Sequence, residues 1–103
     1  VNPGIQVLPD RLCKNCYDLR EVTLPEGLIK IGRKAFHFCM SLLEIKISST
    51  VEYIGKSSFQ GCRSLRKVEF ESSSSSPHQL KTIGDHAFQF CKSLQRIKTP
   101  SSV

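Results

Sequence analysis

Cysteine and histidine are the residues of this chain whose types and spacing come closest to a reactive site. The 103 residues include five cysteines and three histidines. Two residues separate Cys13 from Cys16, as in many zinc sites, but a structural zinc site needs four ligands. The sequence contains no second close pair of cysteines. We therefore expect neither a metal site nor a bound cofactor.

Four of the cysteines occupy one position of a repeated pattern. They are Cys16, Cys39, Cys62 and Cys91. In a stack of equivalent units they would form a ladder that points inward, where a free cysteine packs as a small hydrophobe. Parallel stacking seldom supplies the backbone separation and side-chain direction that a disulfide requires. Cysteines without obvious pairing weakly favour a reducing compartment.

The histidines do not complete a catalytic arrangement. Nucleophilic catalysis requires a cysteine or serine held by a positioned base. We expect His37 and His86 to face outward from turns and His78 to lie in an inserted loop. The repeated cysteines, by contrast, are expected to face inward. The sequence therefore predicts a protein that is not an enzyme.

The repeated pattern runs through nearly the whole chain. An apolar residue, Ile-Gly, Phe, Cys and Leu recur in fixed order in four units, at about 5–25, 26–48, 49–71 and 78–100. The first unit departs from the pattern, with Pro9 in place of the glycine and Cys13 in place of the phenylalanine. In such an array each unit contacts only its neighbours. We expect residues 1–103 to form a single solenoid segment.

Each unit contains two short segments that suit strands. Over residues 42–47, apolar side chains alternate with charged ones, which predicts a strand with one buried face. A second apolar pair ends in Gly32, Gly55 or Gly84, where we expect positive φ or a close approach to the neighbouring unit. Phenylalanine, cysteine and leucine then follow at intervals of three residues, which predicts a helical turn.

The solvent-facing strand positions are the candidate binding residues. They form two columns along the stack, Glu21, Glu44, Lys67, Arg96 and Thr23, Lys46, Glu69, Lys98. The first column changes from acidic to basic, and such a gradient can orient a partner of complementary charge. We predict that these eight residues contact a protein partner.

The net charge of +6 favours acidic partners without identifying them. A basic cluster is expected on the side opposite these columns, formed by Lys30, Arg33, Lys34, Lys56, Arg63, Arg66 and Lys67. Nucleic-acid binders usually combine such charge with stacking aromatics or a groove-reading helix. A nucleic-acid partner is therefore disfavoured. No stretch approaches the roughly 18 apolar residues needed to span a membrane, and no secretory signal is visible.

Residues 71–79 form an insert where the third unit joins the fourth. This serine-rich insert has the composition of a flexible loop, and an insertion in a repeat array maps to a loop on one edge. Serines before Pro77 could accept phosphate, and each phosphate would add about −1.5 to −2 charges beside a basic surface.

The full string of residues resembles a known repeat. Leu-x-x-Ile-x-Ile, followed by Val-x-x-Ile-Gly-x-x-x-Phe-x-x-Cys-x-x-Leu, is similar to the BspA-type leucine-rich repeat. The resemblance covers about residues 5–100 and is most specific in the middle two units. It implies a right-handed α/β solenoid. A short parallel sheet of residues 19–24, 42–47, 65–70 and 94–99 would form the concave side, with short strands and helical turns on the convex side.

The resemblance also implies a role in recognition, because members of that family are mostly surface or secreted recognition proteins, several of them adhesins. We expect a non-catalytic protein–protein interaction or scaffold module that presents a rigid surface. Two alternatives stay open, a secreted or cell-surface adhesin-like domain and a structural linker subunit of a larger assembly. Neither end shows a convincing cap, so we expect a segment of a longer protein or ends that are covered. Its compartment and oligomeric state stay open.

Overall fold

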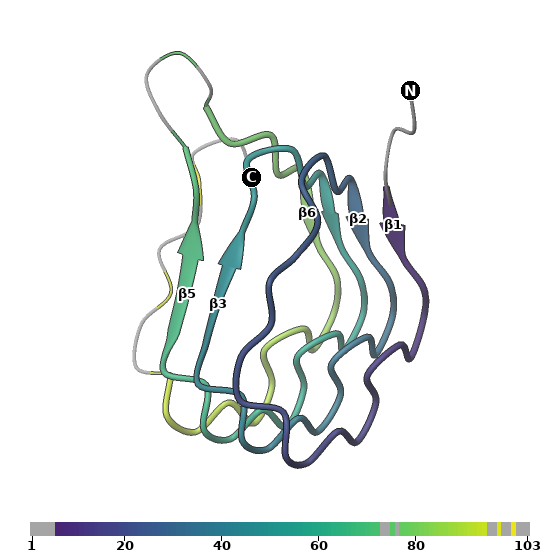
Figure 1. Cartoon of the computed structure of the whole chain (residues 1–103), viewed down its shortest axis with the longest axis vertical. Coiled ribbons are helices and arrows are strands. Elements are labelled where there is room, and N and C mark those ends of the chain that lie inside the picture. Colours follow the sequence, from purple (N-terminus) through teal and green to yellow (C-terminus); the bar gives the residue numbers. More distant parts are fainter. Residues whose placement is uncertain (1–5, 73–74, 76, 95–96, 98–99, 101–103) are drawn as a thin grey trace.

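Two parallel sheets form opposite sides of a stack of similar coils. The structure is a computed structural model that describes residues 6–72, 75, 77–94, 97 and 100. One sheet has four strands in the order β1 (Val7–Leu8), β2 (Lys30–Ile31), β4 (Tyr53–Ile54) and β6 (Thr82–Ile83). The other consists of β3 (Glu44–Ile47) and β5 (Lys67–Phe70). Figure 1 shows the two sheets on opposite sides, joined by turns.

The register of both sheets follows the repeat in the sequence. Lys30 pairs with Tyr53, and Ile31 pairs with Ile54, which is the same position one unit later. The pairs between β4 and β6 span the longer interval created by the serine-rich insert. Every strand therefore lies beside its own equivalent, and the predicted solenoid arrangement is confirmed for the described residues.

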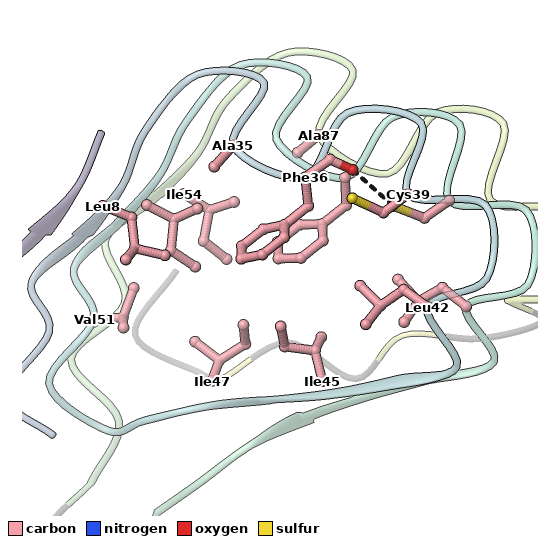
Figure 2. Packing of buried hydrophobic residues seen from close by; sticks show 14 of the residues in the cluster. Leu8, Ala35, Phe36, Cys39, Leu42, Ile45, Ile47, Val51, Ile54 and Ala87 are labelled. Carbon is pink, nitrogen blue, oxygen red and sulfur yellow. Dashed lines mark hydrogen bonds between the residues drawn. The ribbon is translucent and has the colours of Figure 1, made fainter. Parts of the chain in front are cut away.

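Apolar repeat positions fill the space between the two sheets. Ile45 and Ile47 of β3 are buried, as are Leu28 and Ile31 in the opposite wall. Figure 2 shows Phe36 in the centre of this core, where three phenylalanines form a continuous stack. The ring centroids of Phe36 and Phe59 are 5.2 Å apart, and those of Phe59 and Phe88 are 5.3 Å apart. This core holds neighbouring coils in register.

The predicted helical turns are wrong for the described residues, which contain no helix. The N–H groups of Ala35, His37 and Cys39 donate to carbonyl oxygens three residues earlier. The intervening N–H groups of residues 34, 36 and 38 donate instead to carbonyls of the next unit, at Lys56, Ser58 and Gln60. Because alternate N–H groups bond between units, a helical hydrogen-bond ladder cannot form, and the segment is a series of tight turns.

Left-handed backbone conformations recur at two positions of these turns. Among the described residues they occur at Arg11, Lys34, Ser57 and His86, and again at Asn15, Phe38, Gly61 and Phe90. Gly32, Gly55 and Gly84 have no positive φ, so these glycines are explained by the close approach of the neighbouring unit. A Cβ atom on Gly55 would lie 2.7 Å from the carbonyl carbon of Gly32. Here the coils approach too closely for any side chain.

The predicted strands on the β3 side are confirmed only in part. β3 and β5 lie within residues 42–47 and 65–70. Residues 19–24 do not form a strand and contribute a single bridge, from Glu21 to Glu44. Among the described residues this segment has a neighbour on one side only, and Val22 and Leu24 are only partly buried. The fourth segment, 94–99, lies largely outside the described residues.

Candidate recognition surface

The outward side chains of β3, β5 and the segment beside β3 form one surface, here called the strand face. It comprises Glu21, Thr23, Glu44, Lys46, Lys67 and Glu69. The strand face arises from period-two alternation, since Glu44 and Lys46 are exposed while Ile45 and Ile47 are buried. The structure thus brings six of the eight predicted binding residues together. The other two, Arg96 and Lys98, lie outside the described residues.

Paired outward positions of β3 and β5 carry opposite charges. Glu44 pairs in register with Lys67, and Lys46 pairs with Glu69. Glu21 is bridged to Glu44, so two carboxylates lie side by side at one end of the first column. The predicted change from acidic to basic therefore exists in space over Glu21, Glu44 and Lys67.

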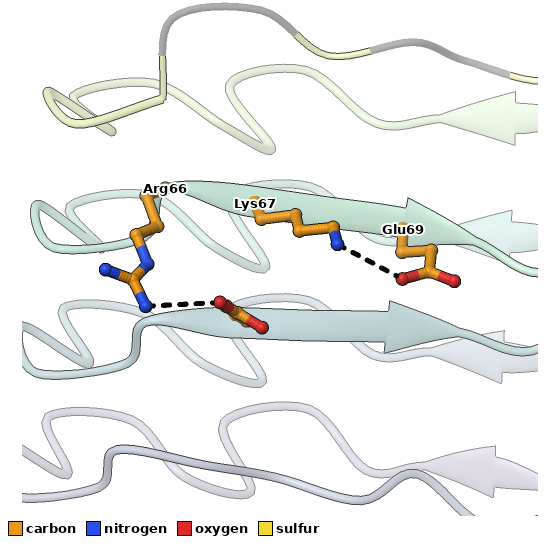
Figure 3. Close-up of polar contacts among 4 residues, drawn as sticks. Arg66, Lys67 and Glu69 are labelled. Carbon is orange, nitrogen blue, oxygen red and sulfur yellow. Dashed lines mark hydrogen bonds and ion pairs between the residues drawn. The ribbon is translucent and has the colours of Figure 1, made fainter.

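Two ion pairs hold some of these charges (Figure 3). A guanidinium nitrogen of Arg66 lies 3.3 Å from a carboxylate oxygen of Glu44, and the Lys67 ammonium lies 3.6 Å from Glu69. Exposed pairs of this kind contribute about 0–1 kcal/mol, so a partner could replace them at little cost. In the part of the chain that the structure describes, Lys46 makes no ion pair.

Two hollows open at the acidic end of the strand face. The first, of about 260 Å³, is lined by Glu21, Val22, Thr23, Glu44, Ile45 and Lys46. The second, of about 240 Å³, is lined by Val22, Thr23, Leu24, Glu26, Lys46, Ser48 and Glu71. Four carboxylates and one ammonium group surround them together. This end of the strand face suits basic side chains of a partner better than acidic ones.

The basic cluster predicted on the opposite side is divided in the structure. Arg33, Lys34 and Lys56 line one groove on the turns that follow β2 and β4. Arg66 and Lys67 instead belong to the strand side, where they pair with carboxylates. Successive side chains of strands and turns point in different directions, so residues that are close in sequence lie on different faces of the molecule.

The cysteine ladder is confirmed at three of its four rungs. Cys39, Cys62 and Cys91 are buried, and the thiols of Cys39 and Cys62 donate to carbonyl oxygens of Cys13 and Phe36 at 3.0 and 3.1 Å. The Cys91 thiol donates in the same way to Phe59. Cys16, the remaining rung, is exposed and not buried as predicted.

Burial makes the buried thiols poor nucleophiles. It raises the pKa of Cys39 and of Cys91 to about 11, and it raises the pKa of Cys62 further. The thiolate is the reactive form. We expect iodoacetamide at about pH 8 to modify Cys16 in the native protein and to leave these three unmodified, as read by peptide mass spectrometry. All five should react in denaturant, and native modification of Cys62 as fast as Cys16 would contradict the fold.

His78 belongs to the insert, where a flexible loop was expected, but its side chain is buried and only 6% exposed. The Leu80 N–H donates to its Nδ1 at 3.1 Å, so Nε2 carries the proton and donates to the Ile47 carbonyl at 3.2 Å. Burial lowers the pKa of His78, which keeps the ring neutral. The side chain anchors the end of the insert to β3. The serine-rich composition of the insert did not predict this burial. The one histidine in the insert was the residue that could have indicated it.

The described residues contain no group of three or more histidine, cysteine, aspartate or glutamate residues placed to hold a metal ion. No helix among them is long and apolar enough to cross a membrane.

The comparisons with known proteins agree on one kind of fold. Residues 6–103 match the BspA type leucine-rich repeat region, a family model described with six copies. A leucine-rich repeat protein from Bacteroides ovatus is 38% identical, with a TM-score of 0.76 over 87% of this chain and 23% of that one. No curated protein sequence is a match.

Two further solved structures are similar at 31% identity and a TM-score of 0.68. The T. pallidum leucine-rich repeat protein aligns over 91% of this chain and 42% of its own. The pneumococcal vaccine antigen PcpA aligns over 84% of this chain and 20% of its own. This chain therefore spans less than half the length of each of these three relatives.

Proposed function

Because this chain belongs to the BspA-type leucine-rich repeat family, we propose that it is a non-catalytic module that presents its strand face to a partner protein. The module works by rigid display. Stacked phenylalanines and buried aliphatic residues fix the backbone, so the charged side chains of β3 and β5 are held at set spacings. A surface that is already ordered loses little conformational entropy on binding.

The observation that carries the proposal is the charge pattern of the strand face combined with its hollows. Carboxylates at Glu21 and Glu44 flank the first hollow, and Lys67 lies one coil further on. A partner with a basic segment beside an acidic one would match this order in one orientation only. Such complementarity fixes register and excludes wrong partners.

The adhesin-like role is a specialised form of the same proposal. One relative is a pneumococcal vaccine antigen, and a recognition domain on a bacterial surface would use the same kind of face. The linker role is favoured by a different observation. Val7, Leu12 and Tyr17 are each at least half exposed on one end of the stack, and exposed apolar surface of this kind marks contact sites.

A charge reversal on each sheet separates the strand face from the rest of the surface. We expect Lys67→Glu to weaken partner binding about tenfold, or about 1.4 kcal/mol, because it reverses the charge at the basic end of the strand face, where the acidic segment of the partner would lie. Lys30→Glu makes the same charge change on β2, in the opposite sheet, and should bind normally. Affinity capture from extracts and medium of the source organism, compared across the three proteins by quantitative mass spectrometry, supplies the partner. Calorimetry then measures the affinities.

Both variants must show the same thermal unfolding midpoint as the original protein, since both positions are exposed. Equal capture by all three proteins would contradict a role for the strand face. Loss of the partner in Lys30→Glu alone would move the binding surface to the sheet of β1, β2, β4 and β6.

A further inference from the structure

The largest hollow described on this molecule lies away from the strand face. It has a volume of about 440 Å³ and is here called the basic groove. Its lining residues are Arg11, Arg33, Lys34, Lys56, Ser57, Gln60, His86 and Gln89. We propose that the basic groove binds a linear anionic polysaccharide that carries sulfate groups, independently of the protein partner of the strand face.

The groove is built from two columns of equivalent positions that directly follow β1, β2, β4 and β6. The first column is Asp10, Arg33, Lys56 and Asp85, and the second is Arg11, Lys34, Ser57 and His86. Asp10 and Asp85, at the two ends of the first column, do not line the groove. Hydrogen bonds between coils fix the columns, since the N–H groups of Arg11 and Lys34 donate to the carbonyls of Arg33 and Lys56. Adjacent parallel strands lie about 4.8 Å apart. Cations from successive coils therefore repeat at about that interval along the groove.

The backbone of the second column is in the left-handed region, with φ of 61° at Arg11, 56° at Lys34 and 57° at Ser57. Residues other than glycine rarely adopt this backbone conformation. Here it recurs in every described coil, so the direction in which these side chains leave the chain also recurs. The cations are thus positioned by the solenoid and are not an accidental surface cluster.

The charge of the groove is only partly compensated. Arg33 lies 3.6 Å from the Asp10 carboxylate, and its backbone N–H donates to Asp10 at 2.8 Å. That hydrogen bond is the main reason why the pKa of Asp10 is lowered. Within the described part of the chain, Arg11, Lys34 and Lys56 make no ion pair, and no carboxylate lines the groove. Three cationic groups are available to an anionic ligand.

A row of polar side chains runs beside the cations. The Gln60 amide nitrogen donates to the Gln89 side-chain oxygen at 2.6 Å, and His37 Nε2 lies 3.1 Å from the Gln60 oxygen. Among the described residues, the amide nitrogen of Gln89 has no hydrogen-bond partner. It offers directional donors next to the cations, which suits ligand hydroxyl and sulfate oxygens.

The chemistry of the lining selects among polyanions. No phenylalanine, tyrosine or tryptophan lines the groove, whereas single-stranded nucleic acids are bound largely by stacking on aromatic rings. The groove also crosses several coils, so it suits an extended chain better than a single small anion. Regularly spaced cations with amide and hydroxyl groups beside them match a sulfated polysaccharide.

The test uses a heparin hexasaccharide as the probe and two double variants of equal charge change. Lys34→Gln/Lys56→Gln removes two cations from the groove, and Lys46→Gln/Lys67→Gln removes two from the strand face. We expect the groove variant to bind the hexasaccharide about tenfold more weakly by calorimetry at physiological salt, with a flatter dependence of affinity on salt because fewer counterions are released. The strand-face variant should bind within about twofold of the original protein.

Equal loss in both double variants would overturn the proposal, because it would show an effect of net charge alone. Absence of hexasaccharide binding by the original protein would overturn it as well. So would displacement of the hexasaccharide by inorganic sulfate at an equal concentration of sulfate groups, which would indicate a site for a free ion. If a short DNA strand bound more tightly than the hexasaccharide through Lys34 and Lys56, the ligand of the groove would be a nucleic acid and the proposal would be wrong. All variants should match the original protein in thermal unfolding, since the described residues give Lys34, Lys46 and Lys56 no ion pair and the pair of Lys67 with Glu69 is exposed.

Discussion

Replacing Phe59 by alanine is expected to lower the free energy of unfolding by about 3–5 kcal/mol. Phe59 is fully buried and stacks on both sides, against Phe36 at 5.2 Å and Phe88 at 5.3 Å. The substitution removes both ring contacts and leaves a cavity that the fixed spacing of the coils prevents from closing. Urea denaturation followed by circular dichroism measures the change.

The matched control for this prediction is Phe90→Ala. Phe90 is 58% exposed, so its truncation removes the same number of atoms with little lost burial and should cost under about 1 kcal/mol. If Phe59→Ala cost no more than Phe90→Ala, the central phenylalanine stack would not be the support of the array.

Gly55→Ala should have a comparable effect through backbone crowding. A Cβ atom at Gly55 would lie 2.7 Å from the carbonyl carbon of Gly32 and 2.8 Å from the nitrogen of Arg33. These are backbone atoms of the adjacent coil, and they cannot move without widening the spacing between units. Overpacking of this kind costs about 1–3 kcal/mol, and we expect the upper end of that range in urea denaturation.

Gly27→Ala provides the comparison, because no atom lies within 4 Å of a Cβ built there. Gly27 has a φ of +77°, so the substitution costs only the left-handed backbone conformation, about 1–2 kcal/mol. A larger loss of stability for Gly27→Ala than for Gly55→Ala would mean that the coils are not in close backbone contact at the repeated glycines.

The strands and the core were predictable because side-chain alternation and burial obey the same geometry. A strand with Ile45 and Ile47 on one face must place Glu44 and Lys46 on the other, and the structure agrees. The repeat also predicted contacts between units, since equivalent residues in neighbouring units lie side by side. The predicted strand face followed from these two facts alone.

The turns were not predictable from the same periodicity. Residues three apart, such as Phe36 and Cys39, lie on one side of a helix, but they also lie on one side of a chain of tight turns. The deciding feature was the left-handed backbone at Lys34 and Phe38, and neither residue type signals it. Asn15 and Gly61 occupy the position equivalent to Phe38. Their tolerance of positive φ was the available signal in the sequence.

The finer features of the surface depended on contacts that one-dimensional patterns do not carry. The pairing of Arg66 with Glu44 joins residues of different coils. The burial of His78 accompanies its hydrogen bond to the Ile47 carbonyl of β3, a contact between residues far apart in sequence. The basic groove arises because the residues that follow successive glycines stack on one another. The sequence identified three of its four cations without indicating that they share a groove.

Cross-linking to a captured partner tests the central claim most directly. A lysine-reactive cross-linker, followed by mass spectrometry of the complex, reports which lysines lie against the partner. Lys46 and Lys67 belong to the strand face, whereas Lys30 and Lys81 are exposed on the side of the opposite sheet. We predict that cross-links to the partner concentrate at Lys46 and Lys67. Cross-links concentrated at Lys30 and Lys81 would contradict recognition by the strand face.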